Sequence, residues 1–245
     1  MIRFIIAILF VVLALILSMP VYLVLLLIGL YSPETKEKVS MYFLHVSFRI
    51  IVFIAGTKVK FIGESNIPKD RAVLYVGNHR SYFDVIIPGT KLSYPSTFVA
   101  KKEFNRIPLL NLWMKNIHCL MLDRSDVKEG LKMVLKAIEY IKEGRSVFVF
   151  PEGTRNRTED LLLPFKEGAM KISTKSGCPI IPVAITNSAD VFEAHFPKLK
   201  KTEVVVHYGN PIYPDTLNKE ELRFIGNKVA SAIESMLRDD AALIG

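Results

Sequence analysis

The chain of 245 residues contains only two cysteines, Cys119 and Cys178. Their number and spacing match neither a disulfide framework nor a structural zinc site. We therefore expect free, buried thiols in a reducing compartment, and no metal site. The sequence also lacks the signature of any nucleic-acid-binding module, although its formal net charge is +8. This charge suits an anionic bilayer or an acidic carrier, and we expect no nucleic acid among the partners.

Charged residues are absent from residues 4–31, and this gap defines the N-terminal part of the chain. As a helix the segment would extend roughly 40 Å at about 1.5 Å per residue, which is enough to cross a bilayer. A cleavable signal peptide is the alternative, but its apolar core would be shorter and would precede a small-residue cleavage site. Pro20 predicts either a kink in one spanning helix or a bend between two shorter helices.

A second apolar segment, residues 41–55, contains His45 and Arg49, whose polar groups would be costly at the centre of a bilayer. We interpret it as an interfacial or re-entrant helix with Tyr42 and Arg49 at headgroup depth. A core helix packed on a soluble domain is the alternative. The expected division is a membrane-associated helical unit over residues 1–56 and an α/β domain over residues 57–245.

The rest of the chain alternates between apolar runs and amphipathic segments, which is typical of an α/β domain. We predict an α/β fold with a mixed central sheet flanked by helices, preceded by an N-terminal hydrophobic helical element that anchors it to a membrane. The predicted strands cover residues 58–62, 72–76, 97–100, 146–150, 180–185 and 203–208.

Two helices of this domain have recognisable starts. One is expected to begin at Asp126, which forms a capping-box pattern with Glu129, and to end at Gly144. The other is expected to run from Asn218 to about Arg238. The predicted buried stripe of the first helix consists of Leu131, Val134, Leu135, Ile138 and Ile141.

Residues 78–84, with the sequence NHRSYFD, follow the predicted strand at residues 72–76. His79 is therefore expected just past a strand end, where open α/β sheets place their ligands. Asp84, five residues further on, can turn back toward the imidazole. A carboxylate on one ring nitrogen fixes the tautomer and leaves the other nitrogen free to accept a proton from a hydroxyl. The alternative is a loop histidine with a purely structural hydrogen bond, because a histidine and an aspartate five residues apart are common by chance.

A second turn, residues 150–157 with the sequence FPEGTRNR, follows another predicted strand. Gly153 allows the backbone to approach a ligand closely, and N–H groups around it can point at an anion. Arg155 supplies a planar fork suited to phosphate. Two roles stay open for Glu152: holding a ligand hydroxyl or bracing an arginine. A basic block at residues 101–108, KKEFNRIP, is by itself typical of a solvated charge cluster.

The segments at residues 78–84, 101–108 and 150–157, in this order along the chain, resemble motifs of the glycerolipid acyltransferase family. The resemblance is closest to its lysophosphatidate (1-acylglycerol-3-phosphate) acyltransferases. The resemblance covers about residues 72–185 and includes the Asp-Arg at residues 123–124 and the PIIPV strand at residues 179–183. It implies that His79 is the general base and Asp84 its partner, and that Arg155 binds the phosphate of the acyl acceptor. The substrate-binding residues that it implies are Lys101, Lys102, Arg124, Glu152, Gly153, Thr154 and Arg155.

The resemblance further implies transfer of an acyl group from acyl-CoA or acyl carrier protein to the 2-hydroxyl of 1-acyl-sn-glycerol-3-phosphate, which gives phosphatidate. The thioester is a co-substrate, and no cofactor is expected. Attack is expected to be direct, with backbone N–H groups around Gly153 stabilising the oxyanion; a nucleophilic Ser81 is the rival. The expected location is the cytoplasmic membrane, with the active site on its cytoplasmic face. Another lysolipid or glycerol-3-phosphate as acceptor, and a non-catalytic lipid-binding protein, are the alternatives.

Overall fold

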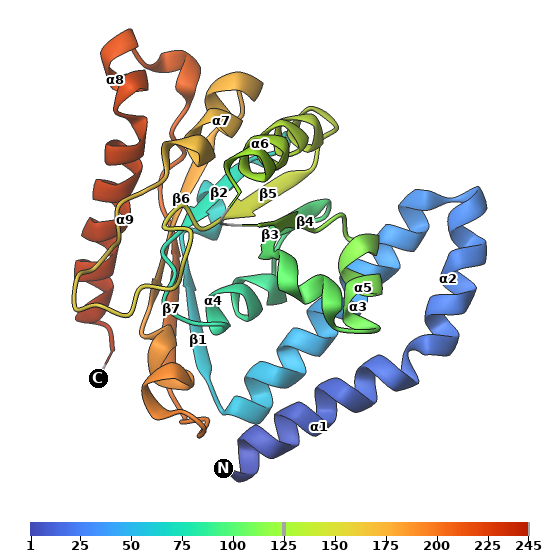
Figure 1. The fold of residues 1–245 in the computed structure, drawn as a ribbon. Helices are drawn as coiled ribbons and strands as arrows, with labels where there is room; N and C mark the ends of the chain where they lie inside the picture. The colour runs from blue at the N-terminus through green and yellow to red at the C-terminus, as the bar shows by residue number, and fades with distance from the viewer. Residues whose placement is uncertain (124–125, 245) are drawn as a thin grey trace.

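A mixed β-sheet forms the centre of the structure, a computed structural model that describes residues 1–123 and 126–244 (Figure 1). The order of the seven strands found in these residues is β1-β7-β6-β2-β5-β3-β4. Neighbouring strands run parallel except for β6 and β7, which are antiparallel. The prediction of an α/β fold with a mixed central sheet is confirmed. The strands are β1 (Lys58–Ile62), β2 (Leu74–Gly77), β3 (Ser96–Lys101), β4 (Leu120–Leu122), β5 (Ser146–Val149), β6 (Ile180–Thr186) and β7 (Glu203–Tyr208).

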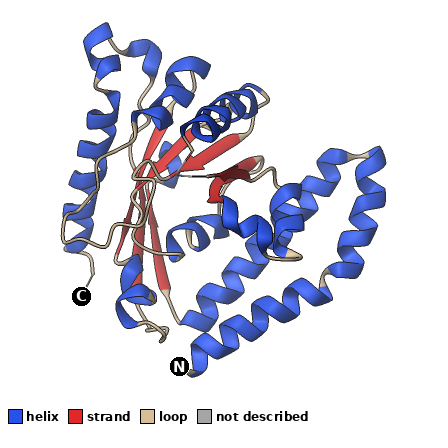
Figure 2. Cartoon of the chain, in the orientation of Figure 1, coloured by secondary structure: helices blue, strands red, loops and turns tan. Residues whose placement is uncertain are grey.

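Helices cover both faces of this sheet (Figure 2). One face packs against α6 (Val127–Lys142), α7 (Met170–Ser176) and α9 (Ile225–Ala241). The other face packs against the end of α3 (Pro33–Ala55) and against α4 (Phe83–Ile86). Because helices pack on both sides, the central strands are mostly apolar, and every residue of β2 and β5 is buried.

Helix α6 begins as predicted, because the Asp126 side chain accepts hydrogen bonds from two backbone N–H groups of its first turn. The predicted buried stripe is partly wrong. Val134 and Ile141 are buried, but Leu131 is 61% exposed and Leu135 is 53% exposed. Ala137, which has no accessible surface, replaces them at the contact with the sheet. The side of the helix that meets the sheet is therefore the one that carries Val134, Ala137 and Ile141, and the two leucines lie toward solvent.

The predicted C-terminal helix is divided in two. The capping box between Asn218 and Glu221 is present and begins α8 (Lys219–Arg223). Phe224 then leaves helical geometry, with φ −109° and ψ 22°, and α9 follows directly. The apolar pattern therefore located the helical region correctly but did not reveal the break at Phe224.

The N-terminal apolar segment forms α1 (Ile2–Leu17) and α2 (Met19–Tyr31), which meet at an angle of 45°. The bend between two shorter helices, one of the two alternatives that Pro20 allowed, is therefore the observed one. Ser18 at the bend accepts a hydrogen bond of 3.1 Å from Nε1 of Trp113 in α5 (Leu110–Asn116). This bond fixes the bend to the α/β domain.

Helix α3 starts eight residues before the predicted apolar segment, with Ser32 as its N-cap. By length and composition α3 is able to cross a membrane, and α1 and α2 meet the same criterion only when taken together. Arg49 donates from Nε to the carbonyl of Thr90 at 3.2 Å, and its expected place at headgroup depth stays a prediction. Glu37 near the start of α3 forms a buried, two-pronged ion pair with Arg145, directly before β5. The division at residue 56 stays a prediction.

Candidate active site

Strands β2, β5 and β3 run parallel and end at the same edge of the sheet. The loops that follow them therefore meet at this edge. His79 comes two residues after the end of β2, and Glu152 three residues after the end of β5. The predicted site thus arises from two turns that are adjacent in space although they are far apart in the sequence.

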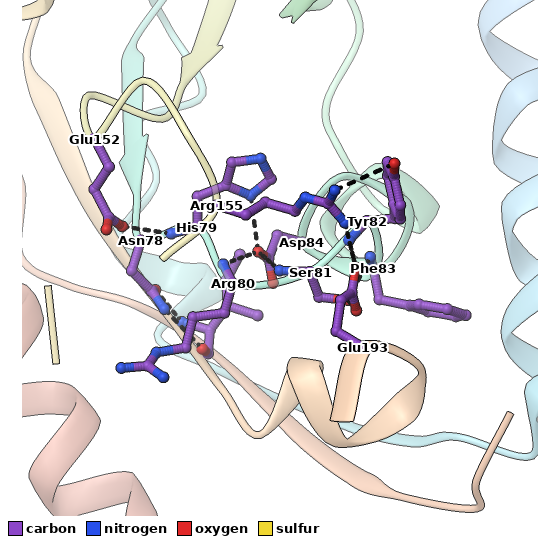
Figure 3. Close-up of polar contacts among 11 residues, drawn as sticks. Asn78, His79, Arg80, Ser81, Tyr82, Phe83, Asp84, Glu152, Arg155 and Glu193 are labelled. Atoms are coloured by element: carbon purple, nitrogen blue, oxygen red, sulfur yellow. Dashed lines mark hydrogen bonds and ion pairs between the residues drawn. The ribbon is translucent and has the colours of Figure 1, made fainter. Parts of the chain in front are cut away.

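His79 and Asp84 form the centre of the site (Figure 3). The distance from His79 Nδ1 to Asp84 Oδ2 is 2.9 Å, and the Asp84 side chain is fully buried. Because an ionised carboxylate only accepts hydrogen bonds, Nδ1 carries the proton and Nε2 stays free to accept one. The same Oδ2 atom accepts backbone N–H groups of Arg80 and Ser81, each at 2.6 Å. The carboxylate is therefore held in place independently of the imidazole.

The imidazole ring of His79 is fixed by its stacking as well as by its hydrogen bond. It stacks on Phe150 with ring centroids 4.3 Å apart and an interplanar angle of 23°. His79 is 7% exposed, so only a small part of the residue reaches solvent. The ring is thus held in one orientation at the surface of the site.

Glu152 joins the two turns. Its Oε1 atom accepts the backbone N–H of His79 at 2.6 Å, and its Oε2 atom accepts the N–H of Leu163 at 2.9 Å. Burial raises the pKa of the Glu152 carboxyl, and these two N–H donors oppose the shift. Neither of the two roles left open by the sequence describes this geometry. Glu152 braces the backbone of the candidate base, and a contact with substrate stays a prediction.

Two further polar residues order the turns around His79. The side-chain amide of Asn78 pairs with both backbone groups of Ile185, at 3.0 and 2.8 Å, and so extends the contact with β6. The guanidinium of Arg80 donates to the carbonyls of Thr158 and Asp160. No role could be assigned to Asn78 or Arg80 from the sequence, because their partners lie on distant segments.

Arg155 is held by a residue that the sequence analysis missed. Its Nη1 atom donates to Glu193 Oε1 at 2.8 Å, and the two side chains are 20% and 21% exposed. The guanidinium also lies over the ring of Tyr82, 3.9 Å from the centroid, and Nη2 is 3.3 Å from its hydroxyl. Glu193 belongs to a short 3-10 helix, Glu193–His195, which carries no recognisable motif.

Ser81 does not have the environment of a nucleophile. Its side chain is buried, and Oγ donates to Glu193 Oε2 at 2.5 Å while it accepts the backbone N–H of Phe83. The hydroxyl proton is therefore directed at Glu193 and away from His79. This geometry favours direct transfer over an acyl-enzyme at Ser81.

The turn at Gly153 favours glycine because its φ is +71°, a conformation that residues with a side chain rarely adopt. A Cβ atom would lie 2.7 Å from Cε of Lys166, which is the end of a flexible side chain that can move aside. The Gly153 N–H donates to the carbonyl of Phe150 at 3.0 Å, so this one group is not available to an oxyanion, and the role expected of other N–H groups around Gly153 stays a prediction. Thr154 beside it is exposed. Lys166 is a cation at this turn that the predicted site did not include.

The basic block lies at the same sheet edge, at the end of β3. Lys101 pairs with Glu103 at 2.7 Å, and Lys102 pairs with Asp123 at 3.3 Å. Within the described part of the chain, these partners are not members of the His79 cluster. Arg124, the remaining predicted binding residue, lies outside the described residues.

Cys119 and Cys178 are free, as predicted, and burial raises the pKa of the Cys119 thiol to about 12. Among the described residues, no group of three or more histidine, cysteine, aspartate or glutamate side chains is arranged to hold a metal ion.

Comparison with known proteins places the chain among acyltransferases. The sequence model of the family described as "Acyltransferase" matches residues 58–186. The 1-acyl-sn-glycerol-3-phosphate acyltransferase of Saccharomyces cerevisiae is 29% identical over 78% of this chain and 64% of its own length. The protein of the same name from Borreliella burgdorferi is 33% identical over 63% of this chain and 62% of its own length. The chain therefore spans less than two thirds of the length of each of these two relatives.

Two other proteins match over most of their length. The probable 1-acyl-sn-glycerol-3-phosphate acyltransferase of Mycoplasma pneumoniae is 30% identical, over 89% of this chain and 88% of its own. The crystal structure of a 1-acyl-sn-glycerophosphate acyltransferase from Thermotoga maritima superimposes with a TM-score of 0.74 and 24% identity, over 98% of each chain. The latter comparison establishes a common fold.

Proposed function

This chain belongs to the acyltransferase family, and from that premise we propose that it transfers a fatty acyl group from an acyl thioester to the 2-hydroxyl of 1-acyl-sn-glycerol-3-phosphate. The observation that carries the proposal is the buried Asp84 carboxylate on Nδ1 of His79, which directs the free ring nitrogen toward a hydroxyl. The names of the relatives support the choice of acceptor. The product is phosphatidate.

In the proposed reaction, Nε2 of His79 takes the proton of the acceptor hydroxyl as its oxygen attacks the thioester carbonyl. Collapse of the tetrahedral intermediate breaks the carbon–sulfur bond, and the thiolate leaves with the proton from His79. Asp84 stabilises the imidazolium that forms between these steps, since its charge is 2.9 Å from Nδ1. The histidine ends neutral, and no group on the protein is acylated.

We assign the phosphate of the acceptor to Arg155, with Lys101, Lys102 and Arg124 as further cations. Arg155 lies beside the residue pair that would activate the hydroxyl, and its bonds to Glu193 and Tyr82 involve one donor nitrogen each. A guanidinium has five N–H donors, so three remain for a phosphate. We place this contact at the turn that contains Gly153, which is half-buried, and Thr154, which is exposed.

The lipid would reach the site from a membrane. Helices α1 and α2 expose many apolar side chains, among them Leu17 at 72%, Leu30 at 76% and Tyr31 at 91%. An exposed apolar area of this kind is typical of contact with lipid. We propose association with the cytoplasmic membrane with the active site on its cytoplasmic face, where acyl-CoA and acyl carrier protein are available as donors.

The test is an assay of the purified full-length protein in detergent and in lipid vesicles. It compares lysophosphatidate, another lysophospholipid and glycerol-3-phosphate as acceptors, each with acyl-CoA and with acyl carrier protein as donor. We expect the highest kcat/KM with lysophosphatidate. A higher value with another acceptor would reassign the substrate, and no transfer to any of them would overturn the proposal. If the protein only bound lipid, the substitution His79→Ala would leave every measurable activity unchanged.

A further inference from the structure

We infer that Glu193 is the positioning residue for Arg155, and that it determines the affinity of the site for an acceptor that carries a phosphate. The inference rests on the proposed function, because it concerns the same acceptor site. Glu193 has no place in the sequence blocks on which the family resemblance depends. It is assigned here on its contacts alone.

The carboxylate of Glu193 makes three contacts with the turns of the site (Figure 3). Oε1 accepts from Arg155 Nη1 and from the backbone N–H of Tyr82, both at 2.8 Å. Oε2 accepts from the hydroxyl of Ser81 at 2.5 Å. One side chain thus connects the turn that carries His79 with the turn that carries Arg155.

These contacts determine where the Arg155 guanidinium lies. It is fixed at one end by the carboxylate and on one face by the ring of Tyr82, 3.9 Å away. An arginine side chain has many rotamers, and its ordering upon ligand binding reduces affinity. Because Glu193 and Tyr82 order Arg155 beforehand, the phosphate meets a guanidinium whose remaining donors are already in place.

The segment that carries Glu193 is itself braced by the N-terminal helix. Phe192 stacks on Phe4 of α1 with centroids 5.1 Å apart, and Phe196 lies edge-on to both rings at 6.4 and 5.4 Å. The backbone around Glu193 is therefore held by a helix that we place at the membrane. The position of Arg155 depends on this support as well as on its own turn.

The experiment measures kcat and both KM values for full-length wild type, Glu193→Ala, Glu193→Gln, Arg155→Ala and the Glu193→Ala/Arg155→Ala double variant. Acceptors are lysophosphatidate and monoacylglycerol, which lacks the phosphate. We expect Glu193→Ala to raise the KM for lysophosphatidate about ten-fold, the equivalent of ordering one arginine side chain. The KM for the thioester donor and the rate with monoacylglycerol should stay within about two-fold, because we assign Arg155 to the acceptor and not to the donor, and monoacylglycerol has no phosphate for it to bind.

The double variant separates positioning from a general structural effect. If Glu193 acts through Arg155, then removing Glu193 from the Arg155→Ala variant should cause no further rise in the KM for lysophosphatidate. The amide of Glu193→Gln keeps an oxygen for Arg155 and Tyr82, and should raise the acceptor KM by only about three-fold, since the hydrogen bonds persist without the charge. If the alanine variant does not fold, the glutamine variant in the Arg155→Ala background decides the question in the same way.

Asp190→Asn is the matched control, because Asp190 is a carboxylate of the same segment that faces Lys200 and His195 instead of Arg155. Its acceptor KM should equal that of wild type. Any of three results would overturn this inference and leave the proposed function standing. The KM for lysophosphatidate could be unchanged in Glu193→Ala, or the KM for the donor could rise equally. In the double variant, the removal of Glu193 could raise the KM for lysophosphatidate as much as it does when Arg155 is present. A wild-type protein that acylates no lysophosphatidate would overturn the proposed function first.

Discussion

Replacing Asp84 by asparagine should remove most of the catalytic rate and leave the fold in place. The Oδ2 atom accepts two backbone N–H groups at 2.6 Å as well as Nδ1 of His79 at 2.9 Å. In Asp84→Asn the amide oxygen must take this position, because the amide nitrogen cannot accept from the two N–H groups. The tautomer of His79 is then preserved, and the lost property is the negative charge.

The expected size follows from the burial of this charge. Asp84 has no accessible surface, so solvent does not screen its interaction with the imidazolium that forms in the reaction. We expect a loss of about 3–5 kcal/mol of transition-state stabilisation, which is roughly two to four orders of magnitude in kcat. The amide N–H₂ group would face the buried Oδ1 position, where no partner exists among the described residues, at a cost of about 1–3 kcal/mol in the free energy of unfolding.

The assay is steady-state acyl transfer at saturating lysophosphatidate, together with denaturant unfolding of the same preparations. Asp70→Asn is the control, because the Asp70 side chain is 67% exposed and pairs only with Arg71 among the described residues. Its kcat should match that of wild type. An Asp84→Asn protein that folds and retains a kcat within about three-fold of wild type would refute the role assigned to the buried charge.

Three further changes test other parts of the structure. Gly153→Ala should lower kcat/KM and cost about 1–3 kcal/mol in the free energy of unfolding, since alanine is strained at a φ of +71°. An unchanged unfolding midpoint would contradict this. Glu37→Ala leaves the buried Arg145 unpaired and should destabilise the fold by about 3–5 kcal/mol, with the KM values of the folded protein unchanged. Burial raises the pKa of Glu152 in the folded protein, so folding favours the protonated carboxyl. The free energy of unfolding of wild type, relative to that of Glu152→Gln, should therefore be greatest below the ordinary glutamate pKa of about 4.3. It should fall as the pH rises through the pKa that Glu152 has in the folded protein. Chemical denaturation across acidic pH measures this difference, and a constant difference would be the contrary result.

Much of the fold could be predicted because the apolar runs of this chain are continuous and end abruptly. The boundaries of β1 and β7 agree with the prediction, and those of β2 differ by one or two residues. Strand β4 was missed because three residues, Leu120–Leu122, are too few to show a period. The stripe of α6 was misplaced at Leu131 and Leu135 because both leucines fit the apolar period, although the side that meets the sheet is the one with Val134, Ala137 and Ile141.

The centre of the site was predictable for a local reason. His79 and Asp84 lie five residues apart, in one turn and the helix that follows it, so their contact needs no long-range information. The contact between Glu193 and Arg155 spans 38 residues and joins two irregular segments, which leaves no pattern in the sequence. The brace formed by Glu152 was missed because its partners are backbone N–H groups, which every sequence contains.

The most direct measurement of the central claim is the formation of phosphatidate from lysophosphatidate and an acyl thioester by wild type and by His79→Ala, with lipid binding measured on the same samples. We predict rapid product formation by wild type, a loss of about three orders of magnitude or more in the variant, and equal lipid binding by both. Product formation at the same rate in both proteins, or in neither, would contradict the account.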